Sequence, residues 1–168
     1  MNDKQKMAWR DEEFMDKLLV VVDGSEASER AVEFALRLAH KTGCRLEAAY
    51  PIDTAQMDYL LKLHYFVSDE RASLEEELEV KAQSYLLRVE SLAAACDLEV
   101  ETTILRGAFH TALLRHARET AVKGIILGGC RFSSEEKNFS TNERRLLLEL
   151  AECPVFFIPD ARRDSMLW

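Results

Sequence analysis

Short apolar runs that alternate with helical patterns constrain the fold of this chain more than any other feature. Residues Leu18–Val22 form a continuous apolar run, as expected of a strand that is covered on both faces. Ser25 can cap a helix, and apolar residues recur at helical spacing from there to Gly43. If this strand-helix unit repeats, the chain will form a parallel sheet.

The unit does repeat. We expect four further strands, at Cys44–Tyr50, Leu98–Arg106, Gly124–Gly129 and Val155–Ile158. Helical patterns lie between them, at Leu74–Cys96, Phe109–Thr120 and Asn142–Glu152. Residues Asp53–Asp69 carry more apolar side chains than a solvated loop needs, and predict a short helix or flap. The sequence therefore predicts an α/β fold with a doubly wound, five-stranded parallel sheet and helices on both faces.

The length of 168 residues fits one domain. We expect an N-terminal tail or arm at residues 1–16, the α/β domain at residues 17–159 and a C-terminal tail at residues 160–168. The C-terminal tail ends in Trp168, which could anchor it across an edge of the sheet or leave it loose.

The formal net charge of −8 repels phosphate backbones, so nucleic acid and anionic membranes are not expected partners. No stretch reaches the roughly 18 apolar residues that cross a bilayer, and the charged start Met1–Lys17 has no signal-peptide centre. These features predict a cytoplasmic protein.

Cysteine and histidine give no sign of a reactive centre. The four cysteines are widely spaced, as is typical of reduced structural thiols, and the four histidines form no metal-binding cluster. No phosphate-loop, dinucleotide or hydrolase-elbow motif occurs. No signal pairs Cys130 with His116 as a base, so we do not expect an enzyme or a metal site.

The sequence Val-Val-Asp-Gly-Ser at residues 21–25, followed by an alanine-rich helix, and a late Cys153-Pro154-Val155 strand resemble the universal stress protein family. The resemblance spans roughly Lys17 to Pro159 and implies the strand order 3-2-1-4-5. In that order the first and fourth strands end side by side at a switch point, where ligands bind.

The resemblance also implies a crevice for ATP or AMP, with magnesium, at this switch point. The residues that would line it, or bind another phosphoryl anion there, are Asp23, Gly24, Ser25, Gly128, Gly129, Arg131, Ser140, Thr141 and Asn142. A carboxylate suits ribose hydroxyls, and bare backbone amides suit phosphate.

The phosphate loop departs from the pattern of the nucleotide-binding members. Arg131 replaces the second glycine of that pattern, and Thr141-Asn142 replaces its closing Gly-Ser. Side chains at these positions would enter the space of the phosphates. In this respect the chain resembles the universal stress protein A-like branch, which does not bind ATP. Two alternatives stay open, namely an anion site held by Arg131 and neighbouring hydroxyls, and a surface loop whose Ser140 or Thr141 caps a helix.

The last strand predicts a dimer. Val155, Phe156, Phe157 and Ile158 form a short, bulky strand between two prolines, and we expect it at an edge of the sheet, with one ring on each face. By resemblance to the family, two such strands would pair. The leading hypothesis is a regulator that acts by homodimerisation and contact with an unknown protein, without a cofactor; the competing one is a nucleotide or anion sensor, with or without slow hydrolysis.

Overall fold

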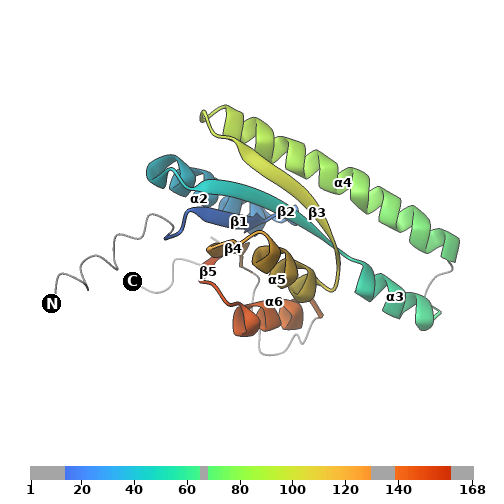
Figure 1. Ribbon diagram of the computed structural model, residues 1–168. Coiled ribbons are helices and arrows are strands. Elements are labelled where there is room, and N and C mark those ends of the chain that lie inside the picture. The colour runs from blue at the N-terminus through green and yellow to red at the C-terminus, as the bar shows by residue number, and fades with distance from the viewer. Residues whose placement is uncertain (1–13, 65–67, 130–138, 160–168) are drawn as a thin grey trace, which may run out of the picture.

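The computed structural model describes residues 14–64, 68–129 and 139–159, and their five strands form one parallel sheet (Figure 1). The strands are β1 (Lys17–Val21), β2 (Arg45–Asp53), β3 (Val100–Gly107), β4 (Gly124–Gly128) and β5 (Val155–Ile158). Their order is β3-β2-β1-β4-β5, so the predicted fold class and strand order are confirmed.

Five helices cover the sheet in the described part of the chain. They are α2 (Glu26–Thr42), α3 (Thr54–Lys62), α4 (Ser68–Ala94), α5 (Phe109–Glu119) and α6 (Phe139–Leu150). Helices α2 and α4 contribute to the core on one face of the sheet, and α5 and α6 contribute to the core on the other (Figure 1). α3 continues from the end of β2 and lies beside the start of α4 (Figure 1).

The alternation of side chains between the two faces of the sheet explains why β1 is apolar from Leu18 onward. Leu18 and Val20 belong to the core under α2 and α4, whereas Leu19 and Val21 belong to the core under α5 and α6. All five β1 residues are buried, and β1 pairs with β2 on one side and β4 on the other. The predicted central strand is confirmed.

Several boundaries differ from the sequence-based expectation. β2 runs three residues beyond Tyr50, because Pro51, Ile52 and Asp53 pair with β3. β1 pairs with β2 only as far as Ala49, so Pro51 stands where no β1 partner needs its missing N–H.

The helix boundaries also shift. α4 begins at Ser68, six residues before the predicted start, and α6 begins at Phe139 instead of Asn142. The short helix expected near residue 53 is α3, where the Asp53 side chain accepts a hydrogen bond of 2.8 Å from the N–H of Gln56.

Gly128 allows α2 to approach β4 closely. A Cβ atom on Gly128 would lie 2.6 Å from the backbone carbon of Ala27 and 2.6 Å from the backbone nitrogen of Ser28. Neither backbone atom can move away as the end of a side chain could. The absence of a side chain at Gly128 therefore has a packing role in the fold.

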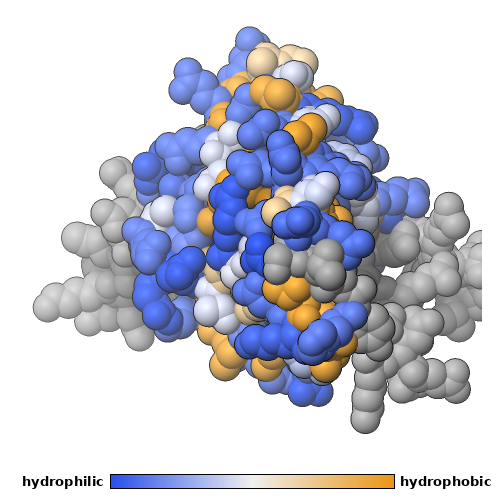
Figure 2. All heavy atoms as spheres, turned by 90° about the vertical axis from the view of Figure 1, so that its right-hand side faces the viewer, coloured by the Kyte–Doolittle hydropathy of each residue, from blue (hydrophilic) through white to orange (hydrophobic). Residues whose placement is uncertain are grey.

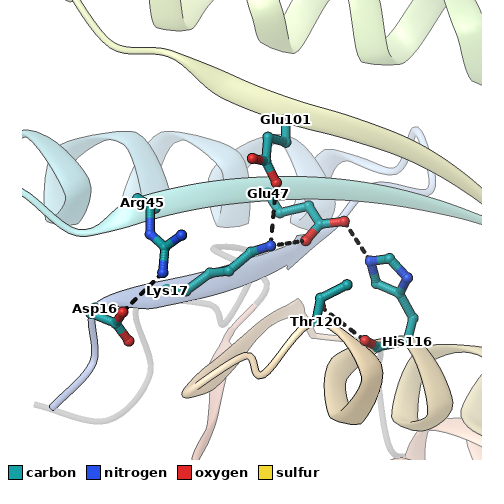
Figure 3. A network of polar contacts seen from close by, with 7 residues as sticks. All are labelled: Asp16, Lys17, Arg45, Glu47, Glu101, His116 and Thr120. Atoms are coloured by element: carbon teal, nitrogen blue, oxygen red, sulfur yellow. Dashed lines mark hydrogen bonds and ion pairs between the residues drawn. The ribbon is translucent and has the colours of Figure 1, made fainter. Parts of the chain in front are cut away.

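A buried charge network lies near the N-terminal ends of the strands (Figure 3). The ammonium of Lys17 is 2.9 Å from the Glu47 carboxylate and 3.2 Å from that of Glu101. The Glu47 carboxylate, 4% exposed, also contacts His116 Nε2. Two basic side chains thus compensate a carboxylate that would otherwise be costly to bury.

The network changes the titration of Lys17. Burial of the ammonium acts to lower its pKa, but the hydrogen bonds and charges of Glu47 and Glu101 outweigh burial, and the pKa of Lys17 is raised. Above the ordinary lysine pKa of about 10.4, the folded protein therefore holds more protons at this site than the unfolded chain does.

We predict that stability falls with rising pH in this alkaline range. The contribution of Lys17 should be complete below about pH 10 and lost as the pH passes its raised pKa. The measurement is the free energy of unfolding by urea from pH 8 to pH 12. Lys17→Met should lower stability at pH 7 by about 3 kcal/mol and show a shallower alkaline decline; parallel declines in both proteins would contradict the assignment.

We predict that Gly128→Ala lowers the free energy of unfolding by about 3 kcal/mol, because the new methyl group meets backbone atoms. The matched control is Gly43→Asn at the end of α2, where φ is 74° and no atom lies within 4 Å of the added Cβ. Asparagine tolerates that conformation, so the control should cost less than about 1 kcal/mol. Equal losses in urea unfolding would show that close packing is not the role of Gly128.

Candidate functional site

The candidate site lies where β1 and β4 end side by side. Asp23 follows β1, Gly128 ends β4, and Arg144 of α6 contacts both. One guanidinium nitrogen of Arg144 donates to the Gly128 carbonyl at 2.9 Å, and another contacts the Asp23 carboxylate. The structure thus brings together two of the predicted residues, joined by an arginine that the sequence analysis did not select.

The predicted turn Asp23-Gly24-Ser25 is tied to the start of α2. Ser25 Oγ accepts from the N–H of Ser28 at 3.1 Å, and the N–H of Ser25 donates to Asp23 Oδ1 at 2.9 Å. The N–H of Asp23 in turn donates to Ser28 Oγ at 3.1 Å. With Arg144 at Oδ2, both oxygens of the Asp23 carboxylate have protein partners.

Tyr85 of α4 covers Gly24. Gly24 has a φ of 77°, and a Cβ there would lie 2.5 Å from the Tyr85 ring. That ring stacks on Tyr50 of β2, with centroids 6.1 Å apart. Burial, followed by the charges of Asp23 and Tyr85, raises the pKa of the Tyr50 hydroxyl. Both the positive φ of the turn and the close Tyr85 ring therefore favour glycine at position 24.

The Arg144 side chain fills the mouth of the crevice. It is 10% exposed, and its guanidinium carbon lies 5.4 Å from the centre of the Phe109 ring. Its Nε is buried and has no partner among the described residues. Arg144 therefore links the ends of β1 and β4 to the start of α5.

Glu143, the neighbour of Arg144, is buried and fixes the first turn of α5. One Glu143 oxygen is 2.7 Å from His110 Nδ1 and accepts from the N–H of His110 at 3.1 Å. α5 has no side-chain cap of its own, so this carboxylate from α6 provides the acceptor near its N-terminus.

A small cavity remains beside these residues. Its volume is about 210 Å³, below the roughly 300 Å³ at which ordinary ligand pockets begin. It is lined by Asp23, Pro51, Asp53, Gln56, Phe109, Glu143 and Arg144. Three carboxylates and one guanidinium line it, so its charges favour a cation over a polyphosphate.

The two glycines predicted to cradle phosphate have other partners. Gly128 packs on the backbone of α2, and the N–H of Gly129 donates to the Ile158 carbonyl at 2.7 Å. Neither the space at Gly128 nor the amide of Gly129 is open to an anion in this arrangement.

The structure describes only part of the rest of the predicted phosphate loop. Arg131, Cys130 and the other loop residues up to Asn138 lie outside the described residues, as do the side chains of Ser140 and Thr141. Asn142 is exposed on α6. His116, the base once considered for Cys130, contacts Glu47.

The sequence analysis missed Glu143, Arg144 and Tyr85. A signal for the first two was present, because Leu147 lies four residues after Glu143 and three after Arg144, so all three share the buried face of α6. Charged residues on an apolar helix face indicate buried ionic partners. Nothing in the sequence indicated that Tyr85 meets Gly24, because that contact joins segments about sixty residues apart.

No helix among the described residues combines the length and apolarity needed to span a bilayer. No group of three or more histidine, cysteine, aspartate or glutamate side chains there is arranged to hold a metal ion.

Comparison with known proteins identifies the family. The family model described as "Universal stress protein family" matches residues 15–159. The universal stress protein YxiE of Bacillus subtilis is 23% identical over 148 residues, covering 85% of this chain and 98% of its own length. A family structure from Burkholderia pseudomallei superposes with a TM-score of 0.70 at 20% identity, covering 88% of this chain and 98% of the other.

A structure of the universal stress protein from Archaeoglobus fulgidus in complex with dAMP has a TM-score of 0.58 and 20% identity, with 86% of this chain and 98% of the other covered. At this identity the structural likeness shows the fold alone, whereas the family model covers nearly all of the described sheet and helices. The chain belongs to the universal stress protein family.

Proposed function

We propose that this protein is a cytoplasmic regulator that acts through homodimerisation and protein contacts, and that its nucleotide crevice is degenerate, as in the universal stress protein A-like branch. The observation that supports this most directly is the contact of Arg144 with Asp23 across the switch point. The guanidinium stands between the ends of β1 and β4, where a switch-point ligand would lie.

Three properties of the crevice argue against ATP. Both oxygens of Asp23 are engaged, so ribose hydroxyls would have to displace protein partners. The cavity of about 210 Å³ is small for a nucleotide. The acidic side chains of Asp53 and Glu143 line it beside Asp23 and would repel phosphate.

Homodimerisation is proposed through β5. This strand ends the order of the sheet, and no other strand of the described residues pairs with its outer edge. The carbonyls of Pro154 and Ile158 accept from β4, so strand alternation turns the amide groups of Val155 and Phe157 outward. An edge of this kind can pair with the same edge of a second copy.

The two β5 rings lie as the sequence predicted, one on each face. Phe156 packs against the core under α2 and α4, and Phe157 packs against the core under α5 and α6. Because both rings pack on the faces of the sheet, the groups at the outer edge of β5 are backbone N–H and C=O groups. We therefore propose that two copies associate by backbone pairing.

A nucleotide or phosphoryl-anion sensor is the second candidate. The partnerless Nε of Arg144 favours it, because a buried guanidinium donor can bind a phosphate oxygen. The relative from Archaeoglobus fulgidus that was solved with dAMP adds to this candidate. In both proposals the protein binds a partner or ligand, and we assign it no catalytic step.

We predict that the nucleotide-free protein does not bind ATP with magnesium at a dissociation constant of about 10 µM or below, roughly 7 kcal/mol. Isothermal titration calorimetry measures this, with AMP as a second ligand. The matched variant is Arg144→Gln, checked for folding by thermal unfolding. Saturable binding to the natural protein that disappears in Arg144→Gln would overturn the degenerate-crevice proposal and support the anion sensor.

We predict that Val155→Pro converts the dimer to a monomer, because proline removes an N–H that faces outward from β5. An edge strand tolerates proline at such a position, so the domain should still fold. Val155→Thr keeps the N–H and the branched shape and should remain dimeric. Sedimentation velocity gives the mass of each variant, and a proline variant that stays dimeric would exclude β5 pairing.

A further inference from the structure

An apolar groove lies beside the start of β5, at the end of the sheet opposite the switch-point crevice. Its volume is about 520 Å³, within the range of ligand-sized pockets. The apolar side chains that line it are Phe14, Met15, Leu18, Phe34, Leu38 and Phe156. A groove of this size with so many apolar side chains favours an apolar occupant.

Two large aromatic side chains at this groove are exposed to solvent. Phe14 is 80% exposed and Phe34 is 37% exposed. The Phe34 ring lies 6.1 Å from that of Phe156, so it forms a wall of the groove with the edge strand. Removing an aromatic ring from water is favourable, so both rings would be stabilised by an apolar group that covers them.

The groove also holds a hydrogen-bond acceptor without a partner. Asp16 lines it, and while Asp16 Oδ2 accepts from Arg45 at 3.0 Å, Asp16 Oδ1 is buried and has no partner among the described residues. A buried acceptor that lacks a donor is costly, so an occupant with an N–H group would remove that cost.

We propose that the occupant is the N-terminal segment Met7-Ala8-Trp9 of the same chain, with the Trp9 ring in the groove and an N–H of the segment bonded to Asp16. The chain enters the described structure at Phe14, which itself lines the groove. Four residues lie between Trp9 and Phe14, so the five backbone steps from one to the other reach at most roughly 17 Å. The indole supplies both a large apolar surface and an N–H donor.

Covalent attachment favours this segment over a second copy. A short linker holds a segment at an effective concentration of the order of millimolar, above that of free protein in most experiments. Because Phe156 belongs to both the groove and β5, the docked segment lies next to the edge that the proposed dimer uses. The docking proposal does not rest on the dimer or on the crevice.

A disulfide assay tests the docking directly, because the half-buried Cys44 lines the groove. Ala8→Cys, which keeps the Trp9 ring, is made with Cys96, Cys130 and Cys153 replaced by serine, so that Cys44 is the second thiol. The matched variant keeps Cys96, exposed beyond the end of α4, and replaces Cys44. With a mild oxidant at low protein concentration, we expect the bond from position 8 to Cys44 to form at least about tenfold faster than the bond to Cys96.

Fluorescence of the natural Trp9 in a Trp168→Phe background gives a second readout, since the chain has two tryptophans. We expect Trp9 to emit at a shorter wavelength than free tryptophan. Phe34→Glu should move this emission to a longer wavelength, whereas the control Val80→Glu, at an exposed position of α4, should leave it unchanged. Equal disulfide rates, a disulfide only between two chains, or emission unaffected by Phe34→Glu would each overturn the proposal. A bond only between chains would assign the groove to a second copy.

Discussion

The guanidinium of Arg144 connects four segments of the chain that meet at the switch point of the sheet. It contacts Asp23 after β1, donates to Gly128 at the end of β4 and lies over Phe109 at the start of α5, while α6 carries it. A buried cation is stable only with a compensating charge, and Asp23 provides it. This contact joins α6 to the ends of β1 and β4, in addition to the packing of Leu147 in the core.

The same contact defines what the crevice can do. In a doubly wound sheet the switch point is the natural place for a ligand, because neighbouring loops diverge there. In this protein the space is taken by side chains: Arg144 stands between the strand ends, and Tyr85 covers Gly24. The family fold is kept, and the small acidic cavity that remains is the basis of our proposal that the crevice does not bind a polyphosphate.

The opposite end of the sheet contains both a buried charged group and an open apolar groove. Glu47 is buried with two basic partners, Lys17 and His116, which offset part of the cost of burying its charge (Figure 3). Beside β1 and β5, by contrast, apolar side chains around Phe34 and Phe156 line an open groove. Viewed from the right-hand side of Figure 1, the surface is mostly hydrophilic with separate hydrophobic areas (Figure 2).

Local sequence patterns were sufficient to predict the architecture. Continuous apolar runs such as Leu18–Val22 and helices bounded by Ser25 and Gly43 are local patterns, and backbone hydrogen bonding with burial on both faces leaves few folds that satisfy them. The sequence also placed Asp23 and Gly128 at one switch point, through the strand order that the family resemblance implied. Element ends were less predictable, because the extension of β2 to Asp53 depends on its pairing with β3.

Which side chains fill the site depends on contacts between segments that are far apart in the sequence. The contact of Arg144 with Asp23 spans 121 positions of the chain, and the contact of Tyr85 with Gly24 joins a helix to a turn. Whether Gly128 and Gly129 face a ligand or the protein depends on the distance of α2 and β5 from β4, which no local pattern encodes. The sequence predicted that the strand-end residues Asp23 and Gly128 meet at the crevice, whereas packing between distant segments brings Arg144 into it.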